Sequence, residues 1–157
     1  MNIIFLTTVY YNIKGVLNLA KTYNLFLSHC WNYSDGYESL IRLLDSDSSF
    51  DYKNYSVPKD DPIHTNGTDA ELYEAIKNKI SPSSVVLILA GVSSSYSKWI
   101  KKEIKIAKNE FITPKPIIAI EPWGAENTSK IVKDNADKIV KWNTSSVISA
   151  IEDLCGD

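Results

Sequence analysis

The stretch that decides the fold is residues 83–91, Ser-Ser-Val-Val-Leu-Ile-Leu-Ala-Gly, in which an unbroken apolar run from Val85 to Ala90 lies between serines and a glycine. A run this short and this continuous is typical of a β-strand that is buried on both faces. Such strands occur in parallel sheets that carry helices on either side. The run is therefore predicted to be the central strand of a sheet of this kind.

Short apolar runs and amphipathic stretches alternate along the chain from Asn24 onward. Further strands are expected at Leu25–Leu27, as a short edge strand starting near Tyr52, at Pro116–Ile120 and at Lys138–Trp142. Helices are expected at Tyr37–Leu44, from the capping box Thr68–Glu71 to Ile80, at Lys98–Glu110, at Ala125–Val132, and at Ser145–Leu154 with Asn143 or Thr144 as the cap. The order predicts an α/β fold with a central, mostly parallel five-stranded sheet and helices on both faces.

The composition indicates one globular domain. The chain has 157 residues, of which 44% are hydrophobic and 23% charged, and these proportions are typical of a soluble protein. A net charge of -2 provides no basic field for nucleic acid. No stretch approaches the roughly twenty apolar residues of a membrane helix, so neither nucleic acid nor membrane is expected as a partner.

The domain is expected to span residues 23–155, after an N-terminal extension at residues 1–22. The extension contains a short apolar run from Ile3 to Leu6, but no positive charge precedes it and no suitable cleavage site follows, so it is not a convincing signal peptide. It is either an added strand and helix or a poorly ordered leader.

The cysteines and histidines do not form a metal-binding pattern. Cys30 and Cys155 lie almost a whole chain apart, and only His29 and His64 could join them. This set is poor for zinc, so no metal is expected. We expect free thiols, as is typical of a reducing cytoplasm.

Glu103 breaks the pattern of its predicted helix. At about 100° per residue, it falls inside the apolar arc that Trp99, Ile104 and Ile106 share. An unpaired carboxylate costs several kcal/mol to bury, so the group needs a partner, a proton or a polar cleft. The structural alternative is a Glu at the margin of the arc that accepts a backbone hydrogen bond. Glu110 also projects into the arc, but the position of a residue at the end of a helix says little.

Three motifs resemble those of the TIR domain superfamily. Asn24–His29 is similar to its first strand, commonly Asp-Val-Phe-Ile-Ser-Tyr, and Ser97–Ile104 resembles its helical signature Ser-x-Trp-x-x-x-Glu. The loop Asn54–Pro62 is similar to one in the prokaryotic TIR-like group, which includes the Thoeris anti-phage protein ThsB. The resemblance implies a flavodoxin-like TIR fold over about Tyr23 to Leu154. Two departures are Cys30 and Trp31, which stand where several NAD-consuming relatives carry basic residues, and the extension, which has no counterpart in the usual family start.

The resemblance implies an enzyme that cleaves the nicotinamide–ribose bond of NAD+, as a glycohydrolase or an ADP-ribosyl cyclase. NAD+ would be the substrate, with no separate cofactor, and the product an ADP-ribose-derived signal in defence. Further implied partners are other copies of the chain, in a homo-oligomer, and a downstream effector that responds to a nucleotide messenger. Glu103 is implied as the catalytic carboxylate. The implied substrate-binding residues are Ser28, His29, Trp31, Asn54, Ser56, Asp61 and Trp99.

Simpler interpretations exist for several of these residues. A large indole such as Trp99 is more often part of a core, His29 could be a strand-end residue satisfied by backbone, and a polar loop is usually solvated surface. A non-catalytic TIR interaction module and a nucleoside deoxyribosyltransferase-like enzyme are alternative functions. A receiver domain is set aside because Ala90-Gly91 stands where its phospho-accepting Asp would be. A dinucleotide-binding Rossmann protein is set aside because no glycine-rich phosphate loop occurs.

Overall fold

The computed structural model describes residues 21–28, 34–57, 67–91, 97–124 and 127–156. In these ranges the chain alternates between strand and helix. The elements are β1 (Thr22–Ser28), α2 (Ser34–Asp45), β2 (Asp51–Asn54), α3 (Asp69–Ile80), β3 (Val85–Leu89), α4 (Lys98–Asn109), β4 (Ile117–Glu121), α5 (Lys130–Asp134), β5 (Lys138–Lys141) and α6 (Thr144–Cys155).

The strands form one parallel sheet in the order β2-β1-β3-β4-β5. The predicted central strand is confirmed, because β3 pairs with β1 on one side and β4 on the other. Val85 to Ile88 are fully buried in it, as a strand covered on both faces requires. The predicted short edge strand is also confirmed, since β2 pairs only with β1 among the described strands.

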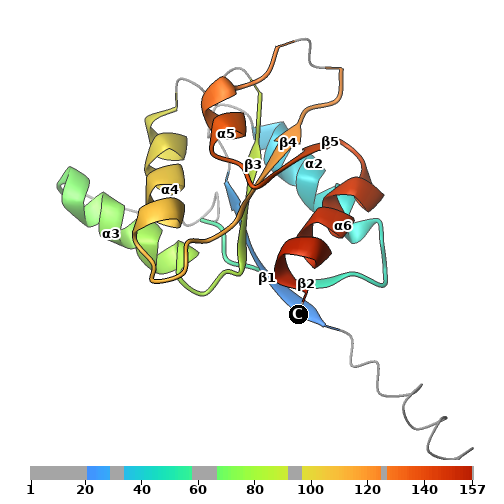
Figure 1. The fold of residues 1–157 in the computed structure, drawn as a ribbon, viewed down its shortest axis with the longest axis horizontal. Coiled ribbons are helices and arrows are strands. Elements are labelled where there is room, and N and C mark those ends of the chain that lie inside the picture. Colours follow the sequence, from blue (N-terminus) through green and yellow to red (C-terminus); the bar gives the residue numbers. More distant parts are fainter. Residues whose placement is uncertain (1–20, 29–33, 58–66, 92–96, 125–126, 157) are drawn as a thin grey trace, which may run out of the picture.

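Helices cover both faces of the sheet (Figure 1), as predicted. On one face α3, α4 and α5 pack against side chains such as Val86 and Ile88. On the other face α2 and α6 pack against Val85 and Leu87. Successive strand residues point to opposite faces, so one apolar run supplies both cores.

The helix predicted to begin at Ala125 begins later. Ala125 itself lies outside the described residues, but Thr128 forms an antiparallel bridge with Gly91, and the Ser129 amide donates to the Ala90 carbonyl at 2.8 Å. This backbone pairing keeps the chain extended up to Ser129, so α5 starts only at Lys130. The position of this helix start is therefore set by a contact with Ala90 and Gly91, which directly follow β3 and are distant in sequence from the helix.

In the part of the chain that the structure describes, side chains cap the starts of three helices. Thr68 and Glu71 form the predicted capping box of α3. Asn143, one of the two residues predicted to cap α6, accepts a hydrogen bond from the Ser146 amide at 3.1 Å. Ser97 accepts one from the Ile100 amide at 3.2 Å at the start of α4. The Ser97 cap fixes the first turn of α4, whose Glu103 contacts Ser28 at the carboxyl end of β1.

None of the helices in the described ranges is long and apolar enough to cross a membrane.

Replacement of Thr68 by alanine removes the acceptor for the Glu71 amide and should lower the free energy of unfolding by about 1 kcal/mol. Thr68→Ser keeps a hydroxyl at the cap and should stay close to the wild type. Urea denaturation monitored by circular dichroism measures both values. Equal stability of Thr68→Ala and the wild type would show that the capping box does not stabilise α3.

Candidate active site around Glu103

Glu103 is buried inside the molecule, with 1% of its surface exposed. It lies on the side of α4 that faces the sheet, together with Ile100, Ile106 and Ala107, which are also buried. The carboxyl group therefore occupies a position that an aliphatic side chain would normally fill. This confirms that Glu103 lies within the apolar arc of the helix.

Two neutral side chains hold the Glu103 carboxyl group. The indole Nε1 of Trp99 donates to Oε1 at 2.7 Å, and the Ser28 hydroxyl donates to Oε2. Neither contact involves the main chain, so the alternative of a Glu tied to a backbone amide does not describe this residue. Within the described ranges, no lysine, arginine or histidine forms an ion pair with Glu103.

Burial raises the pKa of Glu103 from 4.5 to about 8, although the hydrogen bonds from Ser28 and Trp99 oppose the shift. Desolvation penalises the charged form, and two neutral donors only partly offset this. The carboxyl group therefore retains its proton over most of the neutral range. Glu110 and Glu121 differ, because hydrogen bonds from lysines lower the pKa of both.

The direction of the Ser28 side chain follows from its position in β1, where successive side chains point to opposite faces of the sheet. Leu25 and Leu27 belong to the core under α2 and α6, and Phe26 belongs to the opposite core. Ser28 follows Phe26 by two residues and so points to the same face, under α4, with 2% of its surface exposed. The serine predicted to bind substrate thus ends a buried strand and donates to the carboxyl group.

Trp99 precedes Glu103 by one helical turn, a spacing that brings two side chains together. Its ring packs against the core on the side of α3 and α4, and the residue is only partly buried. The indole therefore packs on the core, as the simpler interpretation expects, and its N–H group also contacts the Glu103 carboxyl group. Whether it also contacts a substrate stays a prediction.

Asn54 and Ser56 lie at the end of β2 and brace the backbone there. The Ser56 hydroxyl accepts from the Leu27 amide at 2.8 Å, and the Asn54 side-chain oxygen accepts from the Ser56 amide at 2.9 Å. The Asn54 amide group also donates to the Tyr37 hydroxyl at 2.8 Å. These contacts fix the chain beside the carboxyl end of β1, close in sequence to Ser28. A role of either residue in binding remains a prediction.

Three predicted substrate-binding residues, His29, Trp31 and Asp61, lie outside the described residues, and so does Cys30. Their predicted roles are untested by the structure. In the described part of the chain, no group of three or more His, Cys, Asp or Glu residues is arranged to hold a metal ion.

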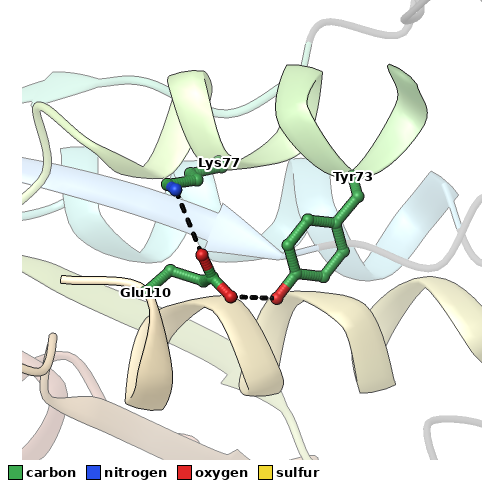
Figure 2. A network of polar contacts seen from close by, with 3 residues as sticks. All are labelled: Tyr73, Lys77 and Glu110. Carbon is green, nitrogen blue, oxygen red and sulfur yellow. Dashed lines mark hydrogen bonds and ion pairs between the residues drawn. The ribbon is translucent and has the colours of Figure 1, made fainter. Parts of the chain in front are cut away.

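A second polar cluster joins α3 to the end of α4 (Figure 2). The Tyr73 hydroxyl donates to Glu110 at 2.8 Å, and the Lys77 ammonium contacts the other carboxylate oxygen at 3.1 Å. The sequence analysis missed this cluster, although Tyr73 and Lys77 are one helical turn apart on α3. Glu110 also lines an open hollow of about 400 Å³ between the two helices, with Asp69, Ala70, Tyr73, Glu74, Lys102 and Lys105.

Glu103 does not line this hollow. The charges around the hollow are largely matched, since Lys102 lies 3.5 Å from Asp69, and Glu110 is paired with Lys77. The hollow is thus a seam between two packed helices, and the buried carboxyl group is the stronger candidate for chemistry.

Replacement of Glu103 by glutamine should stabilise the protein at alkaline pH. The folded protein binds the Glu103 proton more tightly than the unfolded chain does. Protonation of Glu103 therefore makes its full contribution to the free energy of unfolding below about pH 4.5. This contribution declines as the pH rises and is lost above the folded pKa of about 8. The glutamine variant lacks this loss, so its melting temperature should exceed that of the wild type at pH 8.5. The difference should shrink toward pH 5.

Thermal unfolding of both proteins from pH 5 to pH 9 measures this effect. Glu74→Gln, an exposed change on α3, is the matched control and should show no such trend. A constant difference between Glu103→Gln and the wild type across the range would contradict an uncompensated buried carboxyl group.

Comparison with known families agrees with the fold and with the motif positions. Residues 26–127 match the family described as Thoeris protein ThsB, TIR-like domain. None of the curated proteins searched matches the chain. The matched region includes Ser28, Trp99 and Glu103 and covers more than half of the chain. We conclude that the chain belongs to the ThsB TIR-like family of the Thoeris defence system.

Proposed function

We propose that the protein cleaves the bond between nicotinamide and ribose in NAD+, with Glu103 as the catalytic carboxylate, and that the ADP-ribose product or a derivative of it serves as a signal in anti-phage defence. The observation that carries the proposal is the buried Glu103 carboxyl group, held by two neutral donors at the carboxyl end of β1. Ligands of open parallel sheets bind beyond the carboxyl ends of the strands. A carboxyl group buried here with no ion-pair partner among the described residues costs stability, so a functional reason for it is needed.

The chemistry of the reaction suits such a group. When the bond between ribose C1′ and the nicotinamide nitrogen breaks, the bonding electron pair leaves with nicotinamide, and positive charge develops on the ribose. A carboxylate beside C1′ stabilises this charge or bonds to it until water, or another nucleophile of the substrate, completes the reaction. In a dry site the attraction is stronger than in water.

The proton on Glu103 in the resting protein fits the same scheme. The nicotinamide ring of NAD+ carries a positive charge, and a cation brought near a buried carboxyl group favours its ionised form. Binding of the substrate would therefore release the proton and produce the reactive carboxylate only when substrate is present. An aliphatic side chain, the usual residue at a buried helix position, could not change its charge when substrate binds.

Ser28 and Trp99 would act as positioning residues. Each donates to one oxygen of Glu103, so together they set the orientation of the carboxyl plane and favour the charged form. The further partners, which are other copies of the chain and an effector that responds to the messenger, belong to the proposal as well.

Glu103→Gln should abolish nicotinamide release while the variant stays folded. The substitution preserves size and hydrogen bonding and removes the charge. Purified wild type, Glu103→Gln and the control Glu74→Gln are incubated with NAD+, with and without lysate of phage-infected cells, and the products are analysed by chromatography and mass spectrometry. Turnover should appear in the wild type and the control alone.

If the wild type releases no nicotinamide under either condition, the proposal is contradicted and a non-catalytic TIR interaction module is favoured. Exchange of bases on a deoxynucleoside, with NAD+ untouched, would instead favour a deoxyribosyltransferase. Unchanged turnover in Glu103→Gln would exclude Glu103 as the catalytic group.

Trp99→Phe and Ser28→Ala should shift the pH profile of turnover. Each removes one donor to the charged form, so the pKa of Glu103 should rise further, and the rising limb of kcat/KM against pH should move to higher pH. Trp99→Phe keeps an aromatic ring. If Trp99 served only in packing, this variant would be less stable, but the rising limb of its kcat/KM profile would stay at the same pH as in the wild type. The measurement is nicotinamide release between pH 6 and pH 10.

A further inference from the structure

The edge strand β2 ends at Asn54, whose side chain bonds to the backbone that follows it. The Asn54 Oδ1 atom accepts from the Ser56 amide at 2.9 Å and also from the Ser56 hydroxyl. Asparagine favours turns of this kind, in which its side chain competes with the ladder of the strand. The Tyr55 amide still donates to the Leu25 carbonyl of β1 at 2.8 Å, and β2 then leaves the ladder.

The Ser56 hydroxyl replaces a backbone acceptor at this point. In a continued parallel ladder, a carbonyl of the strand beyond β2 would accept from the Leu27 amide. The Leu27 amide instead donates to the Ser56 Oγ atom at 2.8 Å. Ser56 is buried, with 6% of its surface exposed, so water is a poor substitute for this acceptor. A side chain therefore holds the β2 side of β1 one residue before Ser28.

A second set of contacts fixes the direction of the Ser56 hydroxyl. Because its proton is donated to Asn54 Oδ1, its lone pairs are available to the Leu27 amide. The Asn54 side chain is held in turn, since its Nδ2 atom donates to the Tyr37 hydroxyl of α2 at 2.8 Å. Tyr37 packs against the core under α2 and α6, so this series of hydrogen bonds begins on a rigid part of the fold.

The series ends at the candidate active site. Ser28 follows Leu27 directly, and its hydroxyl donates to the Glu103 Oε2 atom. Ser28 is the last residue of β1, and the ends of secondary-structure elements open more readily than their centres. A hydrogen bond weakens steeply as its geometry departs from the optimum. The contact between Ser28 and Glu103 therefore depends on how firmly the end of β1 is held, by Ile88 of β3 on one side and by Ser56 on the other.

We propose that Ser56 is a positioning residue, which holds the Ser28 hydroxyl against Glu103 by fixing the end of β1. Asn54 and Tyr37 act with it by orienting the Ser56 hydroxyl. The alternative is the substrate contact expected for Asn54 and Ser56 from the sequence. The Ser56 hydroxyl already donates its single proton within the protein, so it has none to offer a ligand. The inference deepens the proposed function, and rests on it where turnover is concerned.

The titration of Glu103 in the ligand-free protein tests the proposal, because a donor that is held less firmly stabilises the charged form less. Carbon-13 NMR of the side-chain carboxyl carbon measures the midpoint. Ser56→Ala should raise it by at least about 0.4 pH units, the lower end of the coupling between contacting groups. Ser28→Ala should raise it at least as far. The double variant should rise no further than Ser28→Ala alone, because the effect of Ser56 passes through Ser28.

Ser83→Ala is the matched control. Ser83 is also buried, with 2% of its surface exposed, and its hydroxyl also bonds to the backbone, at 2.7 Å from the Ile80 carbonyl. It lies before β3, at the opposite edge of the sheet, so its loss should lower stability and leave the midpoint in place. Asn54→Ala, a change at an exposed position, removes the acceptor of the Ser56 proton. It should shift the midpoint in the same direction and keeps the test available if Ser56→Ala does not fold.

An unchanged midpoint in each folded variant of Ser56 and Asn54 would overturn the proposal. An equal rise in Ser83→Ala would also overturn it, because it would indicate general loosening, and so would a double variant that rises beyond Ser28→Ala. Circular dichroism and thermal melting verify that each variant is folded.

Kinetics separate positioning from substrate contact. If NAD+ is cleaved, Ser56→Ala should move the rising limb of kcat/KM to higher pH. Loss of a substrate contact would instead raise KM and leave both the limb and the midpoint of the ligand-free protein in place, which would overturn the proposal. A lack of NADase activity in all of these proteins would leave the NMR result unchanged, so the two proposals fail separately.

Discussion

The central constraint in this structure is the hydrogen-bonded burial of the Glu103 carboxyl group, with which no cation among the described residues forms an ion pair. Ser28 and Trp99 each donate to one of its oxygens, and burial raises its pKa to about 8. Breaking a buried polar network is costly, because an unsatisfied group remains in a dry environment. The end of β1 and the first turns of α4 are therefore held in one relative position by the same group that the proposed chemistry requires.

The rest of the fold provides the rigid support for this contact. The apolar run of β3 fills both cores and separates β1 from β4 in the sheet, so the carboxyl ends of the strands lie along one edge. Ser97 caps α4 at this edge, and Ser56 secures the backbone next to Ser28. A site built on a strand and a helix is held more precisely than a site built on loops alone.

Much of this arrangement could be predicted from the sequence. The continuous apolar run at β3, and the alternation of short apolar runs with amphipathic stretches along the chain, identify the sheet and its helices. The angle of about 100° per residue in a helix places Glu103 among apolar residues. The partners of Glu103 were harder to predict, because Ser28 is 75 positions away and its contact depends on the pleat of β1 and the packing of α4. The start of α5 differs from the prediction because a backbone contact with the residues just after β3 determines it.

The most direct test of the central claim is the titration of Glu103 itself. Carbon-13 NMR of the side-chain carboxyl carbon, assigned by its loss in Glu103→Gln, reports the protonation state of this one group as the pH is varied. Burial of the group predicts a midpoint near pH 8, well above that of exposed glutamates. A midpoint near the ordinary value of about 4.5 would mean that the carboxyl group is ionised in the resting protein, and would contradict the protonated, buried state of Glu103.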